Sequence, residues 1–174
     1  VLEGAAGLAL DPKGKDLYVA SLSSGSLTHL RRRNDGSLRY EGCVAGLGAN
    51  GCEKLPVESL LGASGVAVSA DGKSVVVASQ AGTVTSFKRS TKSGKVKFKS
   101  CFGDDGEGGC EKPKAASIDQ ATSVVLKGDD VYVASQGGDS LTRLTLDDRG
   151  KLDWVSCVAP RVRKCGKVPA AALD

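Results

Sequence analysis

Aromatic residues are scarce in this sequence of 174 residues, where they make up 4%, and methionine is absent. Only one histidine is present, His29, so a histidine-based metal centre would need ligands from elsewhere. No stretch of about 18 apolar residues occurs, and the sequence therefore predicts no membrane-spanning helix. No segment of about ten residues places apolar side chains at i, i+3, i+4 and i+7, so helices are not expected as main elements.

Charge of one sign is also lacking. Lysine and arginine number 24, and aspartate and glutamate number 20, which gives a net charge of +4. This balance does not match the electrostatic footprint of a nucleic-acid-binding protein, so no nucleic-acid partner is expected. The basic run Arg31, Arg32 and Arg33 has no interleaved aromatic residues that would stack on bases, and we interpret it as a solvated surface.

Known catalytic motifs are missing as well. The sequence has no G-x-S-x-G elbow, no phosphate-binding loop and no H-E-x-x-H. The aspartate-containing turns near residues 11–16, 71–74 and 128–130 are explained by turn chemistry. His29 has Ser86 and Arg143 at its equivalent positions, so we expect a packed or half-exposed imidazole rather than a catalytic one. The sequence therefore assigns no catalytic residue, no metal and no cofactor.

What is present is a repeat. The segments GLALDPKGKDLYVAS (7–21), GVAVSADGKSVVVAS (65–79) and SVVLKGDDVYVAS (123–135) match one another, and Cys43, Cys101 and Cys157 recur at similar spacing. Each segment has two short apolar runs around a turn that contains Asp or Gly, which predicts a β-hairpin. Two further apolar runs follow in each unit. We therefore predict an all-β chain of three four-stranded antiparallel units at about 1–58, 59–116 and 117–174.

The second run of each unit, LYVAS, VVVAS or VYVAS, is apolar at nearly every position. A strand of this kind is covered on both faces, so the sheets are expected to stack face to face. Four-stranded units that stack around an axis are the blades of a β-propeller, which is the fold that we predict.

GVAVSADGKSVVVAS and DLYVAS resemble the YVTN-type, lactonase-like propeller repeats of bacteria. The chain is similar in particular to the secreted branch, whose repeats carry a cysteine, a glycine-rich loop and a second cysteine. The resemblance covers essentially the whole chain and implies the propeller fold. It leaves the activity open, because that fold hosts lactonases, other enzymes and proteins without known chemistry. Three blades are fewer than the family's usual full ring.

The six cysteines lie in three pairs, each pair closing a short loop: Cys43 with Cys52, Cys101 with Cys110, and Cys157 with Cys165. If every unit folds alike, pairing within each unit is favoured over the other pairings that six cysteines allow. Structural zinc is the alternative, but it prefers cysteines two to four residues apart. Disulfides imply a secreted or otherwise extracytoplasmic location. Because the chain begins at Val1 rather than at methionine, we expect a product from which any targeting segment has been removed.

The loops between the paired cysteines differ in charge. The first is neutral, the second carries Asp104, Asp105 and Glu107, and the third carries Arg161, Arg163 and Lys164. These six residues are the candidate binding residues. The alternative is a surface ion-pair network between neighbouring blades, which would contribute little to stability. Calcium at residues 104–111 is a further alternative, because the carboxylates supply hard oxygen ligands, although the ligand spacing of an EF-hand is missing.

The aromatic residue before each first cysteine, Tyr40, Phe98 or Trp154, is either a packing residue or one of a set that stacks on a ligand.

Three blades cannot close a ring, because propellers close with about four to eight blades. Two blade faces rich in Val, Leu and Ala would remain open, and such faces are expected to be covered. Either two chains make a six-bladed ring, or further blades of a longer parent chain complete it. We therefore predict an extracytoplasmic binding or structural module that is completed in one of these ways. The alternative is a lactonase-like hydrolase that uses the central channel of the completed propeller.

Overall fold

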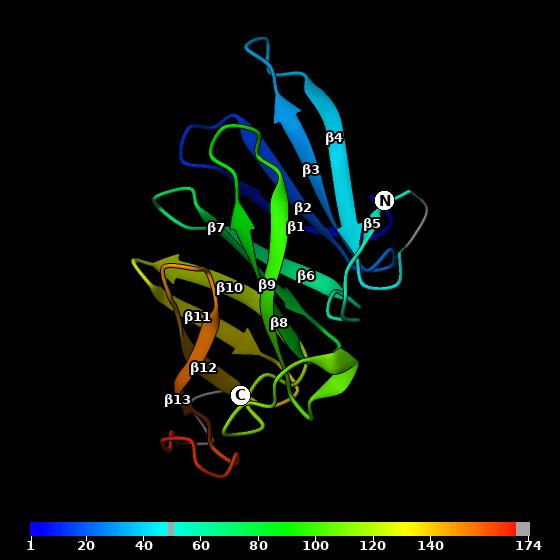
Figure 1. Cartoon of the computed structure of the whole chain (residues 1–174). Coiled ribbons are helices and arrows are strands. Elements are labelled where there is room, and N and C mark those ends of the chain that lie inside the picture. Colours follow the sequence, from blue (N-terminus) through cyan, green and yellow to red (C-terminus); the bar gives the residue numbers. More distant parts are fainter. Residues whose placement is uncertain (49–50, 170–174) are drawn as a thin grey trace.

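The computed structural model describes residues 1–48 and 51–169, except for the side chain of Glu107. Its strands form three antiparallel sheets, one for each repeat (Figure 1). The first sheet contains β1 (Ala5–Leu10), β2 (Asp16–Ser21), β3 (Ser26–Arg32), β4 (Leu38–Ala45) and β5 (Glu53–Lys54). The second contains β6 (Ala63–Val68), β7 (Ser74–Ser79), β8 (Thr83–Arg89) and β9 (Val96–Gly103). The third contains β10 (Ala121–Lys127), β11 (Asp130–Ser135), β12 (Ser140–Leu146) and β13 (Leu152–Val158). A 3₁₀ turn, η1 (Glu107–Gly109), follows β9.

The predicted all-β architecture with three four-stranded antiparallel sheets is confirmed. One detail differs, because the first sheet has a fifth strand, β5, that pairs in parallel with the end of β4. The other two sheets have a single parallel bridge at the same place, Phe102 with Glu111 and Val158 with Gly166. In each repeat the chain therefore turns back after the fourth strand and runs beside it. In the described residues, no helix is long and apolar enough to cross a membrane.

The three sheets are stacked so that their first strands, β1, β6 and β10, lie side by side (Figure 1). These strands approach closely. A Cβ atom on Gly7 would lie 2.3 Å from the carbonyl oxygen of Ser64, and one on Gly65 would lie 2.9 Å from that of Thr122. Both contacts are too short for a side chain, so glycine is required where two neighbouring sheets come closest.

Each sheet has a forward face, turned toward the sheet that follows it in sequence, and a backward face, turned toward the sheet before it. Two hydrophobic clusters fill the contacts between sheets, which we call the first seam (sheets one and two) and the second seam (sheets two and three). The first contains Tyr18, Leu60 and Phe87, and the second contains Ile118 and Leu144. Every residue of β7 is buried, whereas burial alternates along β11. The middle sheet is thus covered on both faces and each outer sheet on one.

Candidate functional site

The predicted disulfides are confirmed, since Cys43 bonds Cys52, Cys101 bonds Cys110 and Cys157 bonds Cys165. Each bond joins the last part of an outermost strand to the returning chain. The Cα atoms lie 4.7, 5.0 and 4.7 Å apart in the three bonds, within the usual range. All six cysteines are bonded in this way, so none is left as a thiolate ligand for zinc.

Backbone hydrogen bonds hold the same loops in the same manner. The amide of Glu111 donates to the carbonyl of Cys101 at 2.9 Å, and the amide of Gly166 donates to the carbonyl of Cys157 at 2.8 Å. In the first repeat, the amide of Leu55 donates to the carbonyl of Ala45 at 3.0 Å. The disulfide and the parallel pairing together make a rigid frame that recurs in every blade.

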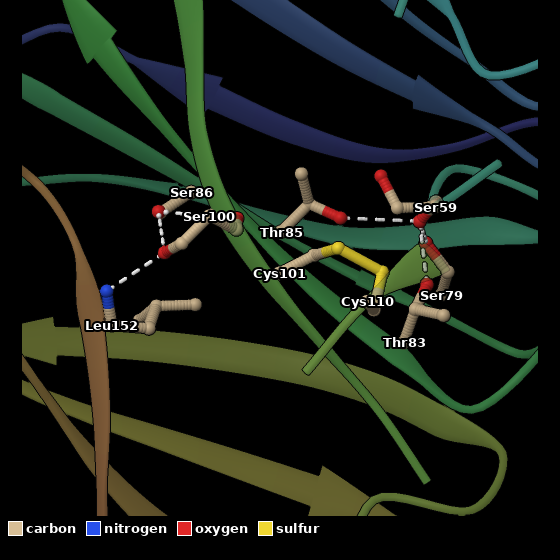
Figure 2. Close-up of a disulfide and its surroundings, with 9 residues drawn as sticks. All are labelled: Ser59, Ser79, Thr83, Thr85, Ser86, Ser100, Cys101, Cys110 and Leu152. Carbon is tan, nitrogen blue, oxygen red and sulfur yellow. Dashed lines mark hydrogen bonds between the residues drawn. A yellow bond between two sulfur atoms is a disulfide. The ribbon is translucent and has the colours of Figure 1, made fainter. Parts of the chain in front are cut away.

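The segment that enters each sheet is fixed to that sheet by hydroxyl groups. In the second sheet, the hydroxyls of Ser79, Thr83 and Thr85 all donate to the carbonyl of Ser59, close to the Cys101–Cys110 disulfide (Figure 2). In the third sheet, Ser140 and Thr142 donate to the carbonyl of Ser117 at 2.8 and 2.7 Å. In the first sheet, Ser26 and Thr28 donate to the carbonyl of Val1 at 3.0 and 2.9 Å. The signal for this anchor is a hydroxyl residue at alternate positions in each third strand, which our sequence analysis missed.

The acidic loop lies between its frame and the start of the third sheet. Asp104 is half-buried, and its Oδ1 accepts a hydrogen bond from the amide of Ile118 at 3.2 Å. Burial, and then the negative charges of Asp119 and Asp105, raise the pKa of the Asp104 carboxyl above its ordinary value. Asp105 is exposed and pairs with Lys112 at 3.2 Å. Glu107 belongs to the same loop, but its side chain lies outside the described part of the chain.

The basic loop presents Arg161, Arg163 and Lys164 to solvent. Among the described side chains, none of these three cations forms an ion pair, and no ion pair joins the acidic and basic loops. The described residues also contain no group of three or more His, Cys, Asp and Glu side chains placed to hold a metal ion. The structure therefore places the six candidate residues in two separate loops on equivalent frames.

The most concentrated buried charge lies elsewhere, in the first seam, and our sequence analysis missed it. We call it the ion cluster, and it consists of Asp11, Asp16, Tyr18, His29 and Arg89. Arg89, at the end of β8, donates to the hydroxyl of Tyr18 at 2.6 Å and to Asp11 at 3.0 Å, and it also bonds Asp16. All five residues are buried.

The charged groups of the ion cluster bond mainly to one another. The imidazole Nε2 of His29 and the guanidinium of Arg31 both lie near Asp16 Oδ1, at 2.8 and 3.1 Å. The ring of His29 stacks on that of Tyr18 at 5.1 Å. Burial raises the pKa of the Tyr18 hydroxyl to about 12 despite the nearby charge of Arg89, so the phenol stays protonated and bonds the carbonyl of Gly94. The cluster therefore serves as a cross-link between two blades.

A cavity of about 250 Å³ lies beside the ion cluster at the outer rim of the first seam. Tyr18, His29, Glu41 and Lys95 contribute to its lining. His29 is buried here as a packed residue, and its Nε2 is engaged by Asp16.

The second seam has a different polar set. The hydroxyl of Ser86 donates to the carbonyl of Gly150 at 2.8 Å, and the amide of Leu152 donates to the hydroxyl of Ser100 at 2.8 Å. Ser86 and Ser100 also bond each other at 2.9 Å (Figure 2). These contacts link the third and fourth strands of the middle sheet to the turn and fourth strand of the last sheet.

The three equivalent aromatic residues do not form one surface. Phe98 packs edge-on against Phe87 in the first seam, and Trp154 packs in the cluster of the second seam. Tyr40 lies on the backward face of the first sheet, where it is exposed. Phe98 and Trp154 each occupy the space between their own blade and the preceding one, so they are packing residues of two different contacts.

No protein-family model and no curated protein sequence matches the chain. Solved structures do match its fold. A putative 6-phosphogluconolactonase from Bacteroides fragilis superimposes with a TM-score of 0.67 at 17% identity, over 95% of this chain and 41% of that one. The periplasmic gluconolactonase of Pseudomonas aeruginosa gives a TM-score of 0.64 at 18% identity, over 91% and 39%. A protein from Lactobacillus plantarum gives 0.65 at 20% identity, over 86% and 40%.

The three sheets are β-propeller blades. At such low identity the likeness establishes the propeller fold and not an activity. The chain spans about two fifths of the length of these structures, which agrees with the two uncovered blade faces.

Proposed function

We propose that this propeller segment belongs to an extracytoplasmic module that binds its ligand through the disulfide-framed loops and that further blades complete. The observation that carries the proposal is that the three loops have the same supporting structure but different charges. Each of the three loops is closed by its own disulfide and held by a similar pattern of backbone hydrogen bonds. Their charges differ, because the first loop is neutral, the second acidic and the third basic. Recognition residues are typically presented in this way, on loops held by a rigid scaffold.

Rigidity supports binding because it lowers the ordering cost. Each loop is closed by its disulfide over nine or eight positions. The chain that follows the first and second loops is also fixed to the next sheet, by three and two hydroxyl groups respectively. A loop that is ordered before it meets a ligand loses little conformational entropy on binding.

The basic loop defines the ligand chemistry. Arg161, Arg163 and Lys164 are exposed and have no carboxylate partner among the described residues. Three adjacent cations favour a ligand that carries carboxylate or sulfate groups, because charge-assisted hydrogen bonds to such groups are strong. We therefore expect this loop to bind an acidic oligosaccharide or peptide.

The test is a binding measurement with sulfated and carboxylated oligosaccharides and with poly-glutamate peptides. The variant R161A/R163A/K164A is expected to lose most of the binding of the wild type. The control K13A/R33A/K92A removes the same charge from exposed residues at the turns between strands, at the opposite ends of the sheets, and should bind normally. Equal loss in both variants, or no binding of any acidic probe, would contradict the proposal.

The extracytoplasmic location rests on the oxidised cysteines. Alkylation of free thiols in the protein as isolated from its source should label none of the six. Labelling without prior reduction would contradict the proposed location.

A lactonase-like hydrolase is the second candidate, favoured by the likeness to solved structures that are named as gluconolactonases. Asp104, which follows β9, lies close to Asp119, which precedes β10, and the raised pKa of Asp104 suits a general acid or base. Hydrolysis of gluconolactone by the folded protein, sensitive to D104N, would favour this candidate. Hydrolysis that a chelator stops would instead indicate a metal-dependent reaction.

A further inference from the structure

The open forward face of the third sheet repeats positions that are buried in both seams. Leu141 is 45% exposed, whereas its equivalents Leu27 and Val84 are 1% and 0% exposed. All three occupy the same place in the register, opposite an alanine of the second strand. The position is built for contact with a following blade.

The open backward face of the first sheet likewise exposes a position whose equivalents in the other two sheets are buried in the seams. Leu8 is 65% exposed, whereas its equivalents Val66 and Val124 are 8% and 6% exposed. Both buried equivalents belong to the hydrophobic clusters of the seams. Each end of the chain therefore carries half of a seam.

The first seam shows which polar residues pair when one blade packs on the next. An aspartate and a tyrosine on the forward face, Asp16 and Tyr18, receive the arginine that ends the third strand of the next blade, Arg89. In the second seam, Ser74 and Val76 hold the positions of Asp16 and Tyr18, and Leu146 holds the position of Arg89. The residue pairs change together, so an Asp and Tyr on one face match an Arg on the other.

Both halves of this polar match are present on the open faces. Asp130 and Tyr132 of the third sheet hold the register positions of Asp16 and Tyr18. Arg32 of the first sheet holds the position of Arg89. Its amide donates to the carbonyl of Lys15 at 2.8 Å, as the amide of Arg89 donates to that of Lys73. Arg32 is exposed, and Asp130 accepts a hydrogen bond from Arg143 at 2.8 Å.

We propose that a second copy of this chain docks its first sheet on the third sheet of the first copy, with Arg32 reaching Asp130 and Tyr132. Because each chain carries both halves, two copies form two such seams and close a six-bladed ring. Closed symmetry then covers all the open blade faces. The apolar faces and the charge match both support a second copy as the occupant.

The new seam is not identical to the first. Ser123 stands where Gly7 and Gly65 allow the inner strands to touch, so the inner strands are held farther apart. Lys127 stands near the place of Asp11, so Arg32 meets one buried carboxylate rather than two. The variant S123G removes this spacer and is expected to strengthen the association of the two copies.

The experiment is a mass measurement by sedimentation equilibrium or light scattering under non-reducing conditions. The wild type should have a mass of about 36 kDa, twice the 17.8 kDa of one chain. L8D and L141D place a carboxylate in the backward and forward halves of the seam, and each should weaken the association by about 100-fold or more. L47D changes an exposed leucine in a disulfide loop and should leave the mass unchanged.

Mixing L8D with L141D separates this arrangement from any other dimer. One of the two seams in the mixed pair joins two unaltered faces, so the mixture should regain a 1:1 dimer that neither variant forms alone. R32L should weaken the dimer less than L8D does, because it removes the charge but keeps an apolar group.

Three results would overturn the proposal: a wild-type mass of one chain, failure of the mixture to associate, or an L8D protein that still forms dimers. A wild-type mass of one chain would indicate that a further blade of a parent chain, and not a second copy, covers the open blade faces. Because L8D and L141D change leucines that are exposed in the single chain, circular dichroism and thiol counting should show unaltered folding. None of these readouts uses a ligand, so their outcome is independent of the proposed binding function.

Discussion

The two seams have the same backbone geometry and different polar chemistry. The first is joined by buried charges around Arg89, and the second by the hydroxyls of Ser86 and Ser100. At equivalent positions, the first seam has Asp16, Tyr18, His29 and Arg89, and the second has Ser74, Val76, Ser86 and Leu146. The comparison indicates that apolar packing and the close inner strands stack the blades, whereas the polar residues are an interchangeable set that must match within one seam.

The largest effect is expected when this match is broken on one side. R89L leaves Asp11 without its side-chain partner and removes one cation from Asp16, both of which are buried. Removal of one partner from a buried ion pair costs about 3 to 5 kcal/mol, so the free energy of unfolding should fall by at least the lower figure. Urea denaturation of the non-reduced protein measures it.

The matched control transfers the second seam's residues into the first. D11S/D16S/H29S/R89L installs the equivalents Ser69, Ser74, Ser86 and Leu146. Removing the charges on both sides of a buried ion network leaves no uncompensated buried charge, and this charge is the main cost when only one partner is removed. The quadruple variant should therefore be more stable than R89L alone. A quadruple variant less stable than R89L would contradict the view that the sets are interchangeable.

A smaller effect should separate the two close approaches of the inner strands. G7A places a Cβ 2.3 Å from a carbonyl oxygen in the first seam, and G65A places one 2.9 Å away in the second. Both force the strands apart, which typically costs about 1 to 3 kcal/mol, and G7A should lie at the upper end. Thermal unfolding of the two variants compares the costs. Equal losses would indicate that the seams open equally easily.

The hydroxyl link of the second seam is expected to contribute about 1 kcal/mol. S100A removes the acceptor for the amide of Leu152 and one partner of Ser86. Its unfolding free energy should fall by that amount relative to S23A, which changes an exposed serine. Hydrogen exchange should show faster exchange at the Leu152 amide in S100A, and unchanged protection there would refute the assignment.

The smallest effect is expected from acid, and it should arise in the first seam. Burial acts to raise the pKa of Asp11, but hydrogen bonds from the amides of Asp16 and Lys15 and the charge of Arg89 outweigh it and lower the pKa below 3.8. A depressed carboxyl pKa contributes stability that is present above the unfolded-state value and is lost as the pH falls through the folded-state value. Between pH 5 and pH 2, about the range in which such groups titrate, the wild type should lose more stability than the quadruple variant. Parallel curves for the two proteins would exclude this contribution of Asp11.

The repeat made most of the fold predictable. Hairpins, their turns and the local disulfides follow from short-range patterns, and all six cysteines pair within their own units as expected. The β5 strand was missed because two residues, Glu53 and Lys54, carry no recognisable pattern.

The ion cluster was missed for a different reason. Arg89 bonds Asp11 and Asp16 across 78 and 73 positions of sequence, and no local period reveals a contact of that range. The charged loops were found because they lie between cysteines. The three cations of the basic loop are exposed, so their partner could only be inferred from chemistry.

The return of the chain beside each fourth strand also protects the protein from aggregation through its sheet edges. The outermost strand of a blade has unpaired backbone groups that could accept a strand from another molecule and begin an aggregate. In each blade, the segment that holds the second cysteine occupies the end of that edge. Along the rest of β9, exposed Lys97 and Lys99 repel a neighbouring edge, which is the usual way in which natural sheets remain soluble.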